Sequence, residues 1–73
     1  MTTKQLKPHL IAAAAEGMEI DKQTHGGYWY VRPETLESTC EELCKAGKLA
    51  RGRKVWTIDR KGYHHSYFTY VKP

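Results

Sequence analysis

The spacing of apolar residues changes from a helical period to a strand period about two-thirds of the way along the chain. Before this point, Leu36, Cys40 and Leu43 recur at intervals of four and three residues, which predicts one buried face of a helix. After it, the segments 54–58 and 63–71 alternate apolar with polar residues, which predicts two strands. The sequence therefore predicts an α+β fold in which a helix precedes a C-terminal β-hairpin.

Residues with defined backbone preferences mark the ends of these elements. Pro33 suits the first turn of a helix, where no backbone partner needs its absent amide hydrogen. Gly47 suits the position after the last turn. The run Asp59–Gly62 has the composition of a tight turn, so we expect it to join the two strands.

Alternation along the two strands predicts which of their side chains face the core. Side chains two residues apart point to the same face of a sheet. The residues expected on the core face are Trp56, Ile58, Phe68 and Tyr70. The residues expected on the other face are Tyr63, His65 and Tyr67. A shift of one residue in the pairing would exchange the two sets.

The first third of the chain predicts a second helix and a less regular segment. Leu6 and Leu10 predict a helix over residues 5–16, which can begin as late as Lys7 because Pro8 fits only near a first turn. Two helices on a sheet with a C-terminal hairpin are thus one predicted architecture. Residues 18–32 contain two strand-like runs, Met18–Ile20 and Tyr28–Val31. If they form a full hairpin, the fold is αββαββ with a four-stranded antiparallel sheet.

The length of the chain predicts one domain, residues 1–73. Its longest apolar run, Leu10–Ala15, is far shorter than the roughly 20 residues that span a bilayer. The start of the sequence also lacks the apolar stretch of a secretory signal. We therefore expect a cytoplasmic protein without a membrane partner. Cys40 and Cys44 are expected as buried free thiols, because parallel side chains one helical turn apart suit a disulfide poorly.

Positive and negative charges are separated along the sequence. Residues 1–44 contain four Lys or Arg against seven Asp or Glu, a net charge of −3, whereas residues 45–73 contain eight against one, a net charge of +7. Such separation predicts one positive face, and clustered Lys and Arg bind phosphate groups. Aromatic residues among them could stack on unpaired bases. The candidate nucleic-acid-binding residues are Lys45, Lys48, Arg51, Arg53, Lys54, Arg60, Lys61, Tyr63 and Tyr67.

The order of a helix, the segment Ala46–Arg51 and a basic hairpin with an aromatic return strand resembles the second half of a winged-helix domain. The resemblance covers residues 33–73. It implies that residues 33–46 form the recognition helix and that the hairpin forms the wing. It also implies that Arg51, Arg53 and Lys54 lie at the base of the wing and that Arg60 and Lys61 lie at its tip. Most members of the family have a further helix where residues 18–32 look strand-like.

Two functions are compatible with these observations. The first is a nucleic-acid-binding module, for DNA rather than RNA, that acts without a cofactor as a monomer or homodimer. The resemblance implies an accessory role in transcription or recombination. The second is a protein-interaction module or inhibitor that docks by charge complementarity through the acidic helix 33–46. The glutamates that favour this second function are Glu34, Glu37, Glu41 and Glu42.

No pattern in the sequence predicts catalysis or a metal site. There is no set of nucleophile, base and orienting residue, and no glycine loop of the phosphate-binding type. His64 and His65 could join Cys40 and Cys44 in a zinc site only with the wrong spacing, because adjacent residues of a strand point to opposite faces. We therefore expect a protein that is not an enzyme and binds no metal.

Overall fold

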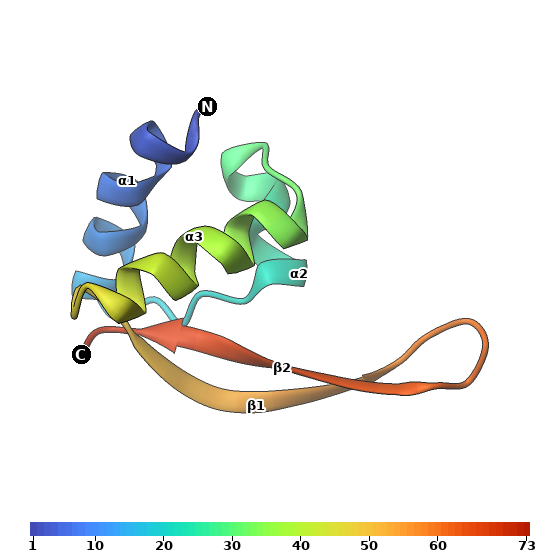
Figure 1. The fold of residues 1–73 in the computed structure, drawn as a ribbon. Helices are drawn as coiled ribbons and strands as arrows, with labels where there is room; N and C mark the ends of the chain where they lie inside the picture. Colours follow the sequence, from blue (N-terminus) through green and yellow to red (C-terminus); the bar gives the residue numbers. More distant parts are fainter.

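A long antiparallel hairpin runs along one side of the molecule (Figure 1). The computed structural model describes residues 1–73, and its sheet consists of β1 (Ala50–Ile58) and β2 (His64–Val71). The predicted turn at residues 59–62 joins the two strands. None of the helices combines the length and the hydrophobicity needed to cross a membrane.

The helices gather over one end of this hairpin. They are α1 (Thr3–Ala15), the short α2 (Lys22–His25) and α3 (Pro33–Lys45), and a 3-10 helix (Gly26–Trp29) follows α2 directly. Both α1 and α2 pack against α3, and α1 also contacts β2. The molecule is therefore a small α+β domain with three α-helices and a two-stranded sheet.

Helix α1 begins earlier than the sequence predicts. The hydroxyl of Thr2 accepts a hydrogen bond from the amide of Gln5 at 3.2 Å, and the Gln5 side chain accepts one from the amide of Thr2 at 2.9 Å. This reciprocal capping box satisfies amides that the first turn leaves without partners. The helix therefore starts at Thr3, before the expected range, and carries Pro8 within it.

Helix α3 begins at the predicted residue, ends one residue before the predicted end at 46, and has the predicted buried face. It starts at Pro33, and Leu36, Cys40 and Leu43 are buried along one side. Gly47 follows its last turn with a φ of 75°, a left-handed conformation that glycine adopts without a steric penalty. This element confirms the helical period read from the sequence.

The predicted strand Tyr28–Val31 does not form. Tyr28 belongs to the 3-10 helix, and Tyr30 has a left-handed φ of 55°, which interrupts any extended run. The preceding α2 forms because Oδ1 of Asp21 accepts hydrogen bonds from the next amides, including that of Gln23 at 2.9 Å. The aromatic residues of this segment predicted a strand, but the Asp21 cap starts a helix instead.

A single backbone bridge represents the other predicted strand. Ile20 pairs with Tyr70 of β2 through two hydrogen bonds, of 2.8 Å and 2.9 Å, and both residues are fully buried or nearly so. Because this bridge has no neighbours, the four-stranded αββαββ alternative is wrong. The core is built from α1, α3, the 3-10 helix, Tyr70 near the end of β2 and two residues outside the elements. It consists of Leu6, Leu10, Ala14, Ile20, Trp29, Leu36, Cys40, Leu43, Leu49 and Tyr70.

A β-bulge interrupts the pairing near the base of the hairpin. Two residues of β1, Gly52 and Arg53, lie opposite the single residue Thr69 of β2. A Cβ on Gly52 would lie only 2.5 Å from Oγ1 of Thr69, so a residue without a side chain is required at this position.

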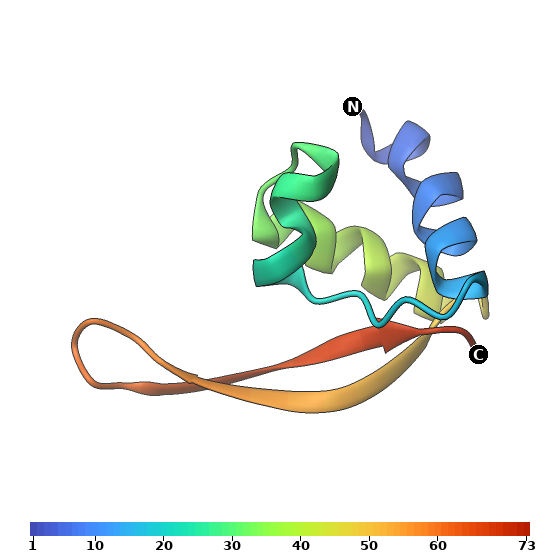
Figure 2. The same ribbon diagram turned by 180° about the vertical axis from the view of Figure 1, so that it is seen from behind.

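The far half of the hairpin extends beyond the helices (Figures 1 and 2). The pairing of Lys54 with Phe68 and of Trp56 with Ser66 places these residues on one face, so the predicted alternation is correct. Burial differs along this face: Tyr70 is buried, whereas Trp56 is 67% exposed and Ile58 is 61% exposed. The prediction that Trp56 and Ile58 belong to the core is therefore wrong, because no helix covers this part of the hairpin.

Candidate nucleic-acid interface

The basic residues of the C-terminal half follow the hairpin from base to tip. Lys45 ends α3 and Lys48 lies in the turn before β1, whereas Arg60 and Lys61 lie in the turn between the strands. These positions are at opposite ends of the hairpin (Figure 1). The predicted residues therefore form a line along the ribbon, with one group at the helical end and another at the projecting tip.

Two of the candidate arginines are engaged inside the protein. The guanidinium of Arg51 pairs with the carboxylate of Glu41 on α3, and Nε of Arg53 donates to both carboxylate oxygens of Glu19 at 3.0 Å. These hydrogen bonds are the main reason why the pKa values of Glu41 and Glu19 lie below their ordinary range. The two arginines connect the base of the hairpin to α3 and to the segment before α2, so part of their predicted role is structural.

Three other cations of the hairpin have no acidic partner. Lys54, Arg60 and Lys61 are exposed, and none takes part in the ion pairs of the molecule. Their positive charge is available to an external anion. This availability distinguishes the outer part of the hairpin from its base.

The only acidic residue of the hairpin organises its turn. Oδ1 of Asp59 accepts hydrogen bonds of 2.9 Å from the amides of Lys61 and Tyr63, and Oδ2 lies 2.9 Å from Nε2 of His65. The hydrogen bond with His65 is the main reason why the pKa of Asp59 lies below its ordinary value. The carboxylate is directed at the turn's own backbone and at His65, and neither neighbouring cation, Arg60 or Lys61, pairs with it.

The two candidate tyrosines have opposite surroundings. Tyr63 is 64% exposed, as a stacking residue requires, but Tyr67 is 7% exposed. The Tyr67 hydroxyl donates to Asp21 at 2.9 Å, and the ammonium of Lys22 lies 5.0 Å from the centre of its ring. Burial, followed by the hydrogen bond with Asp21, raises the pKa of Tyr67 to about 12. The prediction that Tyr67 faces outward is wrong, because the segment around α2 covers it.

Sequence reasoning missed Trp56 as a surface residue. Its indole ring is exposed, and Nζ of Lys54 lies 5.3 Å from the ring centre and 5.5 Å from the centre of the Phe68 ring. The predicted return strand 63–71, with nine residues, spans about 30 Å, whereas the predicted helix 33–46, with fourteen, spans about 21 Å. The predicted strand is therefore longer than the predicted helix, and this difference could have shown that part of the hairpin extends past the helices and is exposed.

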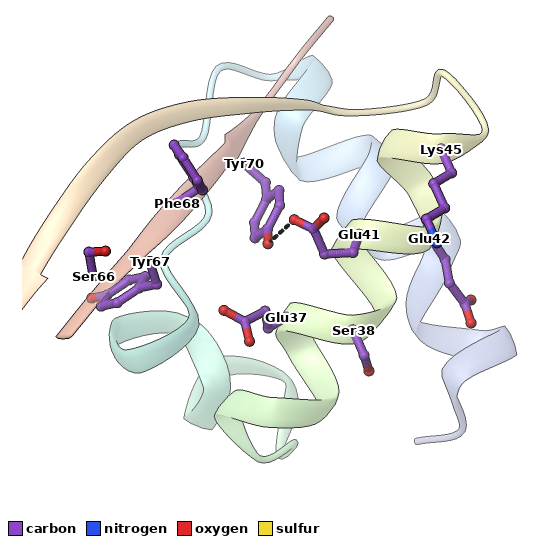
Figure 3. A pocket seen from close by; sticks show the side chains of 9 residues that line it. All are labelled: Glu37, Ser38, Glu41, Glu42, Lys45, Ser66, Tyr67, Phe68 and Tyr70. Atoms are coloured by element: carbon purple, nitrogen blue, oxygen red, sulfur yellow. Dashed lines mark hydrogen bonds between the residues drawn. The ribbon is translucent and has the colours of Figure 1, made fainter.

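An open groove of about 530 Å³ lies between α3 and β2 (Figure 3). The Tyr70 hydroxyl donates a hydrogen bond of 2.5 Å to Glu41 across it. The residues that line the groove are Glu37, Ser38, Glu41, Glu42, Lys45, Ser66, Tyr67, Phe68 and Tyr70. Here the helix implied to be the recognition helix faces the return strand.

The acidic character of α3 is largely neutralised by other elements. Glu42 pairs with Lys7 of α1 at 2.9 Å, and Glu37 pairs with Lys22 of α2 at the same distance. With Glu41 held by β1, three of the four glutamates have a cationic partner within the chain. Charge complementarity toward a protein partner is correspondingly weaker than the sequence implies.

The histidines and cysteines named above occupy separate regions. Cys40 and Cys44 are free thiols of α3, the first buried and the second half-buried, whereas His64 and His65 are exposed on β2. Burial raises the pKa of Cys40 to about 12. No group of three or more His, Cys, Asp or Glu side chains is arranged to hold a metal ion.

Comparison with known protein families, with curated proteins and with solved structures finds no match to this chain.

Proposed function

We propose that the chain is a winged-helix module that binds nucleic acid, DNA rather than RNA, by holding the phosphate backbone along its projecting hairpin. The observation that carries this proposal is the set of exposed cations on that hairpin, Lys54, Arg60 and Lys61, which have no acidic partner in the protein. Phosphates are the anions that such a line of cations binds with release of counterions.

The order of the elements supports the winged-helix assignment. The chain runs through α1, the bridging residue Ile20, α2, α3 and the hairpin. Helix α2 and the 3-10 helix occupy the segment where most winged helices have a further helix, although the sequence predicted strands there. In this assignment α3 is the recognition helix and the β1–β2 hairpin is the wing.

The distribution of charge favours contact through the wing over contact through α3. The exposed side of α3 carries one unpaired glutamate, Glu34, and one cation, Lys45, while the charge of Glu42 is offset by Lys7. Such a surface gains little from approaching a phosphate-lined groove. The wing carries its cations outward, so we assign it the main electrostatic contact. A module of this kind fits an accessory role in transcription or recombination, as a monomer or a homodimer.

The proposal is tested by titrating labelled duplex and single-stranded oligonucleotides with the protein at several salt concentrations. Three phosphate contacts predict a slope of log affinity against log salt of about −3 on duplex and about −2 on a single strand. Replacing Arg60 and Lys61 with alanine should flatten the slope by about one to two and weaken binding to every sequence.

A matched control removes two cations that lie away from the tip. The variant with Lys4→Ala and Lys72→Ala has the same net charge as the variant with Arg60→Ala and Lys61→Ala, so equal losses of affinity in both would exclude a local wing contact. Absence of binding to either oligonucleotide at low salt would exclude the proposal and favour a protein partner.

A further inference from the structure

Two large apolar side chains stand exposed on one face of the projecting hairpin. Trp56 and Ile58 are two residues apart in β1, so they point to the same side, and neither belongs to the core. Exposed surface of this kind on an otherwise polar ribbon marks an interaction site when it is continuous. A ligand that covers apolar groups would remove both side chains from water.

The ammonium group of Lys54 lies on this face, beside the indole ring of Trp56. The ammonium of Lys54 lies between the rings of Trp56 and Phe68, at 5.3 Å and 5.5 Å from their centres. A purely apolar ligand would cover this ammonium without giving it a partner, which is unfavourable. A ligand that joins a flat aromatic surface to a negative charge satisfies both groups, and a nucleotide has this composition.

We infer that the face formed by Lys54, Trp56 and Ile58 stacks on unpaired nucleobases, so that the wing binds single-stranded or locally opened nucleic acid in preference to continuous duplex. This inference rests on the proposed function and names the form of nucleic acid that the wing takes. Base–aromatic stacking tolerates any sequence, because every base has a flat face.

The geometry of the face excludes bases that remain stacked. Within a duplex, away from its two ends, the flat faces of each base are covered by its neighbours, and only base edges are reached from the grooves. Two residues along a strand span about 6.8 Å. This is about twice the 3.4 Å rise between successive bases in a stacked strand. A strand with one base on Trp56 and the next on Ile58 must therefore be unstacked.

Cations lie on both sides of the apolar pair. Lys54 precedes it toward the helices, and Arg60 and Lys61 follow it at the tip, all without acidic partners. A single strand lying along the ribbon would place phosphates near both groups while its bases cover Trp56 and Ile58.

The intrinsic fluorescence of Trp56 gives a direct test. The chain has two tryptophans, and Trp29 is buried in the core. Trp29→Phe leaves Trp56 as the only indole. This variant is titrated with oligothymidylate, oligouridylate, a blunt duplex of equal phosphate number, and heparin, a polyanion without bases. We expect strong quenching by the single strands and none by heparin.

Affinities of Trp56 variants separate stacking from charge. Trp56→Ala and Trp56→Leu should weaken single-strand binding about tenfold to a hundredfold, while Trp56→Phe retains most of it. Affinity for the blunt duplex should be unchanged. Tyr30→Ala is the control, because this tyrosine is 92% exposed on the helical body. All these side chains are exposed, so far-ultraviolet circular dichroism should show an intact fold.

The outcomes distinguish the inference from the proposed function. Equal affinity for single strand and duplex, with no loss on Trp56→Ala, would overturn the stacking site and leave phosphate binding by the wing intact. Failure to bind any oligonucleotide at low salt would exclude both the stacking site and the proposed nucleic-acid-binding function. Burial of Trp56 that depends on protein concentration alone would assign the face to a second copy of the chain and overturn the inference.

Discussion

The hydroxyl of Tyr67 donates a hydrogen bond of 2.9 Å to Oδ1 of Asp21, the same oxygen that caps α2. One carboxylate oxygen thereby joins the return strand of the hairpin to a helix 46 residues earlier in the sequence. Burial acts to raise the pKa of Asp21, but the hydrogen bonds from Tyr67 and from two backbone amides outweigh it and hold the pKa below its ordinary value. Tyr67 therefore fastens the hairpin to the helices.

Tyr67→Phe should lower the free energy of unfolding by about 1–2 kcal/mol, because a partly buried hydrogen bond to a charged group is lost while the ring is kept. Urea denaturation followed by circular dichroism measures the change. Tyr63→Phe is the matched control and should have no effect, since Tyr63 is exposed at the tip. Equal stability of the two variants would show that the hydrogen bond between Tyr67 and Asp21 does not stabilise the packing of the hairpin against the helices.

Gly52→Ala should destabilise the protein by about 1–3 kcal/mol, the usual penalty for overpacking. The new methyl group would meet Oγ1 of Thr69 at 2.5 Å. That oxygen is held by the amide of Arg53 and by Glu19, so it cannot move away freely. Gly27→Ala is the control, because nothing lies within 4 Å of the added carbon. Thermal unfolding of the two variants should differ clearly, and similar melting temperatures would show that the bulge tolerates a side chain.

Stability should fall in acid. The pKa values of Glu19, Glu41 and Asp59 lie below the ordinary values of 4.5 for glutamate and 3.8 for aspartate, mainly through hydrogen bonds to Arg53, Arg51 and His65. A carboxyl group whose pKa is lower in the folded state stabilises the fold above its unfolded pKa and loses that contribution as pH falls through the folded pKa.

The unfolding free energy attributable to these carboxylates should therefore be constant above about pH 5.5 and decline below about pH 4.5. Urea titrations at a series of pH values measure it. Glu19→Gln should be less stable at neutral pH and should show a shallower acid decline, because the charged partner of Arg53 is removed. An identical acid decline in this variant would exclude Glu19 as a contributor.

The two cysteines should differ in reactivity. Burial raises the pKa of Cys40 to about 12, so almost no thiolate exists at neutral pH, and the sulfur is also out of contact with solvent. With Cys44→Ser, native protein should resist iodoacetamide, whereas with Cys40→Ser the half-buried Cys44 should react measurably. Mass spectrometry follows the labelling, and rapid labelling of Cys40 in the folded state would contradict the packing of α3.

The sequence predicts the helices and the hairpin because their signals are local. The apolar stripe of α3 and the turn composition at Asp59–Gly62 depend on neighbours a few residues away. The error over Tyr28–Val31 arose because aromatic residues favour strands on average, whereas the cap at Asp21 and the left-handed Tyr30 decide this segment. Helix α2 was therefore not predicted from the sequence and is seen only in the structure.

The site was harder to predict because its features depend on distant residues. Alternation gives the face of Trp56, but only the positions of the helices show that nothing covers it. The partner of Arg53 is Glu19, 34 residues earlier, so the sequence could not separate structural arginines from free lysines. Tyr67 was placed on the correct side of the strand, but the covering of that side by the α2 segment is a tertiary effect.

The bridge between Ile20 and Tyr70 has a consequence for the order of assembly. The backbone amide and carbonyl of Ile20 are both paired with Tyr70, 50 positions later, and Tyr70 itself is part of the buried core. While the chain is being synthesised, the three helices lack this closing strand until residue 70 has left the ribosome. A nascent chain stalled earlier should therefore remain open to proteases even though every helix has been made.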